Sequence, residues 1–240
     1  YEEALRDLDR AIQQAPSDPT LYVVRGKVYE ATRRPHDALK EYSQALTLDA
    51  NLDEAYRGRG IIYSLLSNYE TAIDDLTQAI RLNPADGLTF LARADAYFAT
   101  GDHEHALSDY HEAIRLSPDN AVGFHNRAVL YQAMGRLENA LEDFNRALQL
   151  DRGFGSAYFN RANVHFELGQ LNAALADYDE AIKLDERDAG AYHNRGITYN
   201  KLGMYEEAIM DFTHVLHLDP NYAEAYYNRH LTYLQRGAPG

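Results

Sequence analysis

Apolar side chains recur at spacings of three and four residues along the whole chain, as in YETAIDDLTQAIRL from Tyr69 to Leu82. This spacing collects them on one side of an α-helix, and no segment has the strict alternation typical of a β-strand. Glycines are expected to end the first helix of each pair, and prolines to follow the second. The glycines are Gly101, Gly135, Gly169 and Gly203, and the prolines are Pro84, Pro118 and Pro220. The pattern therefore predicts a series of helical hairpins.

The same residue types return every 34 residues. An aromatic residue precedes an arginine by three positions in each copy, and small residues from Ala4 to Ala208 and from Gly26 to Gly196 keep the same period. Small side chains at fixed positions allow two helices to approach closely. A constant period of this length indicates a tandem array. The aromatic residues are Tyr22, Tyr56, Phe90, Phe124, Tyr158, Tyr192 and Tyr226.

The recurring motif is an aromatic residue, Asn-Arg-Gly or Asn-Arg-Ala, a tyrosine, a glycine, Tyr-Glu-x-Ala-Ile and x-Leu-x-Pro. It resembles the tetratricopeptide repeat and covers essentially the whole chain. The resemblance implies an all-α, right-handed superhelical solenoid of 34-residue antiparallel helix pairs, whose first helices line a concave surface that binds peptides or helices. The expected array has a lone second helix (1–18), six full repeats (19–52, 53–86, 87–120, 121–154, 155–188 and 189–222), a lone first helix (223–237) and a linker (238–240).

Seven acidic residues, from Asp7 to Asp211, recur with the same period as the seven arginines, from Arg25 to Arg229, so that an acidic residue follows one arginine by sixteen positions and precedes the next by eighteen. Because the two helices of a hairpin are antiparallel neighbours, we expect interhelical ion pairs with a structural role. They include Arg127, Arg161 and Arg195 with Asp143, Asp177 and Asp211. Pairing within a repeat would leave Asp7 and Arg229 without partners, whereas pairing with the preceding repeat would match all seven arginines, and the spacing leaves both choices open.

The resemblance places the residue before each arginine on the concave surface. This residue is asparagine in the last four copies, and its amide offers the donors and the acceptor that a peptide bond requires. Aromatic and amide residues follow the same helix face, although the asparagines could instead bond to neighbouring helices or water. The candidate peptide-binding residues are Asn126, Asn160, Asn194, Asn228, His125, Phe159, His193, Tyr227, Asn163 and Phe166.

The first three copies have apolar or small residues where the later ones have asparagine. This half of the expected surface is more apolar, with Arg57 as the exception, and could hold an amphipathic helix of a partner; packing within the array is the alternative. The residues concerned are Val23, Val24, Leu91, Ala92 and Phe98.

Charge and composition exclude several classes of function. The chain has 37 acidic and 23 basic residues and a formal net charge of −14, which disfavours nucleic acid and anionic membrane surfaces as partners. It has no cysteine and no apolar run long enough to span a bilayer. His103, His105 and His111 lack the spacing of a zinc protease motif, and no glycine-rich phosphate loop is present. We therefore expect no catalytic residue, metal or cofactor.

These observations favour a cytoplasmic protein-interaction scaffold that binds a peptide or helix of a partner protein in its groove. Two alternatives stay open. One is the substrate-recognition or assembly arm of a larger enzyme, which fits a chain that starts without methionine in the middle of a repeat. The other is a structural array that self-associates through the apolar ends of the solenoid.

Overall fold

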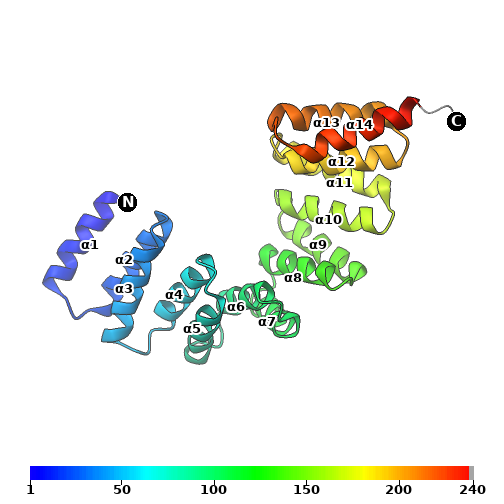
Figure 1. The fold of residues 1–240 in the computed structure, drawn as a ribbon. Coiled ribbons are helices and arrows are strands. Elements are labelled where there is room, and N and C mark those ends of the chain that lie inside the picture. The colour runs from blue at the N-terminus through cyan, green and yellow to red at the C-terminus, as the bar shows by residue number, and fades with distance from the viewer. Residues whose placement is uncertain (238–240) are drawn as a thin grey trace. The chain divides into compact units, whose positions relative to one another are not determined.

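The computed structural model describes residues 1–237, which form fourteen α-helices and no strand. The linker expected at 238–240 lies outside these described residues. The chain divides into two compact units, Tyr1–Asp119 and Asn120–Gly240, which we call the N-terminal and C-terminal units. The expected all-α repeat of helical hairpins is confirmed (Figure 1).

The N-terminal unit contains the first seven helices, drawn from blue to green in Figure 1. Within it, α2 pairs with α3, α4 with α5 and α6 with α7, and each pair also packs against the next. The helices are α1 (Glu2–Gln14), α2 (Pro19–Ala31), α3 (Pro35–Leu48), α4 (Asp53–Leu65), α5 (Tyr69–Leu82), α6 (Gly87–Ala99) and α7 (His103–Leu116).

The C-terminal unit repeats this arrangement, with α8 paired to α9, α10 to α11 and α12 to α13, and with α14 packed on α13. Its helices are α8 (Ala121–Ala133), α9 (Leu137–Leu150), α10 (Gly155–Glu167), α11 (Leu171–Leu184), α12 (Ala189–Lys201), α13 (Tyr205–Leu218) and α14 (Ala223–Gly237).

The turn inside each hairpin is made by one residue with a positive φ angle. Gly101, Gly135, Gly169 and Gly203 have φ between 71° and 80°, a range that glycine adopts without steric cost. A hydrogen bond closes the turn, for example from the amide of Asp102 to the carbonyl of Tyr97, as in a Schellman motif. The first two hairpins have Arg33 and Ser67 in the same conformation, at φ of 56° and 62°.

A large side chain from each second helix fills the space left by a small residue on the first helix. Tyr42 is fully buried, and a β-carbon added to Gly26 would lie 2.8 Å from its ring. Phe212 packs in the same way against Gly196. Tyr42 also reaches the next hairpin, where a β-carbon on Gly58 would overlap its ring. Gly58 is therefore required by the side chain that it faces.

We predict that Gly58→Ala lowers the free energy of unfolding when residue 42 is tyrosine and raises it when residue 42 is leucine. Crowding against the Tyr42 ring should cost about 1–3 kcal/mol, partly offset by a gain in helix propensity of about 1 kcal/mol. With Tyr42→Leu the crowding is gone, so the same substitution should raise the free energy of unfolding. Urea unfolding of the four variants in this cycle measures both effects, and Gly58→Ala stabilising the wild-type chain would contradict the packing.

Candidate functional site

Six arginines of the first helices each hold a carboxylate of the second helix in the same hairpin. Nε and Nη2 of the guanidinium both donate to this carboxylate, over distances of 2.6–3.0 Å. The pairs are Arg25–Glu41, Arg59–Asp75, Arg93–Asp109, Arg127–Asp143, Arg161–Asp177 and Arg195–Asp211.

Nη1 of the same guanidinium reaches the preceding second helix. Nη1 of Arg161 donates to Asn145 at 2.6 Å, and Nη1 of Arg229 donates to Thr213 at 3.1 Å. Equivalent bonds join Arg25 to Asp9, Arg59 to Ser43, Arg93 to Thr77 and Arg195 to Asp179. The arginine therefore links three helices, and we call this arrangement the arginine clamp. Of the two pairings that the spacing left open, the periodic acidic residue thus binds the arginine of its own repeat. Asp7 lies on the surface beside Arg10.

The surroundings of the clamp keep the guanidinium charged. Burial works against the charge of Arg93, but the hydrogen bonds and the charge of Asp109 outweigh it and raise the pKa of the arginine. The aromatic residue three positions earlier lies beside the guanidinium in all seven copies, with Cζ 5.2–5.8 Å from the ring centre. Cation–π attraction therefore adds to the ion pair.

Two histidines join the asparagines of the C-terminal unit into hydrogen-bonded pairs. His125 contacts Oδ1 of Asn126 through Nδ1, at 2.9 Å, and the amide nitrogen of Asn160 through Nε2, at 3.1 Å. His193 contacts Asn194 and Asn228 in the same way, at 3.3 and 3.0 Å. An amide oxygen only accepts, so Nδ1 is the protonated nitrogen and Nε2 accepts from the next helix.

Two further asparagines, Asn163 and Asn200, also take part in contacts between first helices. Nδ2 of Asn194 donates to Oδ1 of Asn163 at 3.0 Å, and this oxygen also accepts the hydroxyl of Tyr178 at 2.6 Å. Asn200 donates to Thr232 at 2.6 Å. The amides thus bond to neighbouring helices, as the alternative interpretation of the sequence allowed, and each of these contacts uses one of an amide's two N–H groups.

The aromatic candidates divide between core and surface. The ring of His125 lies edge-on to Phe144 and tilted against Phe154, with centroids 5.7 and 4.7 Å apart. His193 packs at a tilt against Phe212 and Tyr222. Phe159 meets Tyr178 edge to face. Tyr227 is 64% exposed. These histidines and Phe159 therefore pack against other aromatic rings of their own repeats, and Tyr227 faces solvent.

Two hollows lie along the first helices of the C-terminal unit. The smaller has a volume of about 260 Å³ and is lined by Gln132, Asn163, Phe166, Glu167, Tyr178, Asn194 and Ile197. The larger has about 450 Å³ and is lined by Ile197, Asn200, Lys201, Tyr205, Phe212, Asn228, Leu231 and Gln235. Four sequence-predicted residues line them: Asn163, Phe166, Asn194 and Asn228. Ile197 is shared by both hollows.

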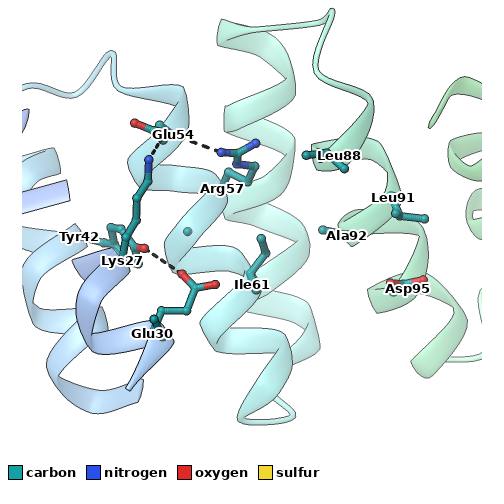
Figure 2. Close-up of a pocket in the computed structure, with 12 residues that line it drawn as sticks. Lys27, Glu30, Tyr42, Glu54, Arg57, Ile61, Leu88, Leu91, Ala92 and Asp95 are labelled. Carbon is teal, nitrogen blue, oxygen red and sulfur yellow. Dashed lines mark hydrogen bonds and ion pairs between the residues drawn. The ribbon is translucent and has the colours of Figure 1, made fainter. Parts of the chain in front are cut away.

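A hollow of about 730 Å³ crosses α2, α4 and α6 in the N-terminal unit, and Figure 2 shows its lining. We call it the N-terminal groove, lined by Lys27, Glu30, Ala31, Tyr42, Glu54, Arg57, Gly58, Ile61, Leu88, Leu91, Ala92 and Asp95. Arg57, Leu91 and Ala92 were expected there, whereas Val23 is only 3% exposed and belongs to the core.

Apart from Arg57, the sequence analysis did not identify the charged residues of the N-terminal groove. Glu54 pairs with both Lys27 and Arg57, and Arg57 also donates to Asp86 at 2.9 Å. The hydroxyl of Tyr42 donates to Glu30 at 2.9 Å (Figure 2). Lys27, Ile61 and Asp95 each follow their arginine by two residues, at the position that Asn163 has in the C-terminal unit. That shared register could have identified Lys27, Ile61 and Asp95 as residues of the groove.

Neither a metal site nor a membrane span is found in the part of the chain that the structure describes. No group of three or more histidine or acidic side chains is arranged to hold a metal ion. None of the described helices combines the length and the apolar character needed to cross a membrane.

Family comparisons match most of the chain. Models described as tetratricopeptide repeat match residues 1–53, and residues 53–86, 121–154 and 189–222. A model described as TPR repeat matches residues 94–135 and 162–203. No curated protein matches the chain.

Several solved structures share the fold at low sequence identity. A chain of the APC/C hetero-tetramer Cut9-Hcn1 has a TM-score of 0.82 and 17% identity, over 96% of this chain and 46% of that one. This chain thus spans less than half of that relative's length. The Pseudomonas aeruginosa protein pilF has a TM-score of 0.79 and 16% identity, over 89% of this chain and 97% of that one. YrrB, described as a TPR protein with an unusual peptide-binding site, has a TM-score of 0.62 and 23% identity, over 78% of this chain and 97% of that one.

We predict that Asp177→Ala lowers the free energy of unfolding by about 3 kcal/mol, because it leaves a mostly buried guanidinium without its carboxylate. The side chains of Arg161 and Asp177 are only 19% and 8% exposed. The control is Asp37→Ala, which breaks a pair with Arg34 whose side chains are 45–47% exposed, and it should cost less than about 1 kcal/mol. Equal, small losses in urea unfolding would contradict a structural role for the clamp.

The stability of the C-terminal unit should fall as the pH is lowered below about 6.5. Burial lowers the pKa of His193 from its ordinary value of 6.5, so the unfolded chain takes up a proton that the folded chain resists. The wild-type unfolding midpoint should therefore drop more steeply between pH 7.5 and 5.5 than that of His193→Gln. His36→Gln, at an exposed position of α3, is the control and should keep the wild-type slope. Identical slopes in all three proteins would refute this expectation.

Proposed function

Because the chain belongs to the tetratricopeptide repeat family, we propose that it is a protein-interaction scaffold. Its partner is a protein that presents a peptide or helical segment to the first helices of the C-terminal unit. The acidic balance of the chain supports a protein partner over nucleic acid, and we place this interaction in the cytoplasm. The proposed function is binding rather than catalysis.

The observation that carries this proposal is the pair of hollows joined at Ile197. Amide side chains alternate in them with apolar ones, namely Phe166, Ile197 and Leu231. Amides suit the main chain of an extended peptide, and apolar surface between them suits alternate side chains. The total hollow is large enough for a few residues, so the binding surface is a groove for a segment rather than a pocket for a small molecule.

The hydrogen bonds of the asparagines are compatible with this role. Asn194 and Asn228 each use one N–H in contacts between helices, which fixes the orientation of the amide. A pre-oriented amide costs a ligand less ordering than a mobile one. The peptide-binding site named for YrrB is a further argument from fold similarity for a peptide ligand.

A photo-crosslinker introduced at Ile197 tests the proposal. In cell lysate it should form an adduct with a discrete segment of one or a few proteins, which mass spectrometry of the crosslinked peptides identifies. The matched control carries the crosslinker at Met210, a 71% exposed residue of the second helix α13. Both variants retain the native asparagines, so the hydrogen-bond network stays intact.

The crosslinked segment is then synthesised and titrated against purified protein. Asn194→Ala together with Asn228→Ala should weaken its binding about tenfold or more if the amides contact the main chain, with circular dichroism to verify the fold. Identical adducts at positions 197 and 210 would refute a specific surface on the first helices. Unchanged affinity of the double variant would refute the role of the asparagines.

A further inference from the structure

The N-terminal groove has an apolar floor that spans two helices. Ile61 comes from the middle helix α4, and Leu88, Leu91 and Ala92 come from α6. Leu88 is 51% exposed, so a ligand in the groove can reach it. Gly58 adds depth, because it contributes no side chain at the position where the C-terminal unit has asparagine. The groove volume of about 730 Å³ falls within the range of roughly 300–1,000 Å³ typical of ligand-binding sites.

The two cations of the groove are already neutralised within the unit. Lys27 pairs with Glu54, and Arg57 is held between Glu54 and Asp86. Both are therefore unsuited to attract an anionic partner. The groove lining as a whole contains two cations and three carboxylates, in a chain with a net charge of −14.

Glu30 lies outside this ion-pair cluster, as does Asp95, which accepts a hydrogen bond from the hydroxyl of Tyr110 at 2.6 Å. Within residues 1–237 Glu30 makes a hydrogen bond with the Tyr42 hydroxyl and no ion pair. Burial and the charge of Glu30 raise the pKa of Tyr42, so the phenol stays protonated and leaves the carboxylate charge unbalanced. In Figure 2, Ile61 lies between Glu30 on one side and Leu88, Leu91 and Ala92 on the other. A negative charge thus borders the apolar floor.

We propose that the N-terminal groove is a second interaction surface, separate from the hollows at Ile197, for a peptide segment that is both apolar and basic. Its apolar side chains cover Ile61, Leu88, Leu91 and Ala92, and a lysine or arginine of the segment reaches Glu30. Apolar burial supplies affinity, while the cation selects this segment over acidic ones and gains from the negative field of the chain. The surface fits a basic amphipathic partner and disfavours an acidic peptide.

Selection from a phage-displayed library of random 12-residue peptides tests this inference with the whole chain as bait. The wild-type protein should enrich peptides that combine aliphatic residues with lysine or arginine. Glu30→Gln removes the charge but keeps an acceptor for Tyr42, and it should lose that enrichment. Glu70→Gln removes one exposed acidic charge from α5, outside the groove, and should retain the enrichment.

The consensus peptide is then titrated by fluorescence anisotropy against the same three proteins and against Leu88→Ala, with circular dichroism to verify the fold of each. Glu30→Gln should raise the dissociation constant about tenfold, and Leu88→Ala should raise it without changing its salt dependence. Equal weakening by Glu30→Gln and Glu70→Gln would reduce the binding to non-specific attraction and overturn the proposal. Selection of acidic or uncharged peptides, or no enrichment at all, would overturn it too. None of these outcomes depends on the crosslinking at Ile197.

Discussion

One buried arginine per repeat makes each hairpin dependent on its neighbours. Arg161 bonds to Asp177 in its own second helix and to Asn145 in the second helix before it, with Tyr158 beside the guanidinium. Removing a cation and a carboxylate from water is costly, and only complete hydrogen bonding offsets the cost. An isolated hairpin would lack one of the two bonded helices and would leave Nη1 without its partner. Stability therefore arises at the junctions between repeats, as expected for arrays whose units contact only their neighbours.

The clamp also explains why the surface chemistry can vary along an otherwise regular array. Successive residues on an α-helix are about 100° apart, so the residue before the arginine points away from the clamp. Val24, Gly58 and Ala92 occupy this position in the N-terminal unit, and asparagines occupy it in the C-terminal unit. The interhelical ion pairs are the same in both units. Two units with one internal construction can thus present an apolar, acidic groove and an amide-rich face.

The sequence predicted the helices, their pairing and the residues of the clamp, because all of these recur with one period. It could not choose the pairing of Arg161, since an acidic residue is available sixteen residues ahead and eighteen behind. The geometry of the guanidinium makes this choice: Nε and Nη2 of Arg161 donate to Asp177 in the same hairpin. Nη1 donates to Asn145, at a different position on the preceding second helix. The packing of His125 and His193 also depends on the aromatic rings of Phe154 and Tyr222, which lie in the loops after the second helices and which helical periodicity does not describe.

The N-terminal groove shows how one packing choice spreads to the surface. Tyr42 is too large for a hairpin whose neighbour has a side chain at position 58, so a glycine there is the condition for its burial. Once buried, the Tyr42 ring directs its hydroxyl to Glu30 and holds that carboxylate at the edge of the hollow that the glycine leaves open. The depth of the groove and the position of this charge therefore both depend on the same tyrosine–glycine contact. A sequence pattern that counts only apolar and polar positions marks Glu30 as polar, but it cannot show that this carboxylate lines the same hollow as Ile61 and Leu88, because those residues come from later repeats.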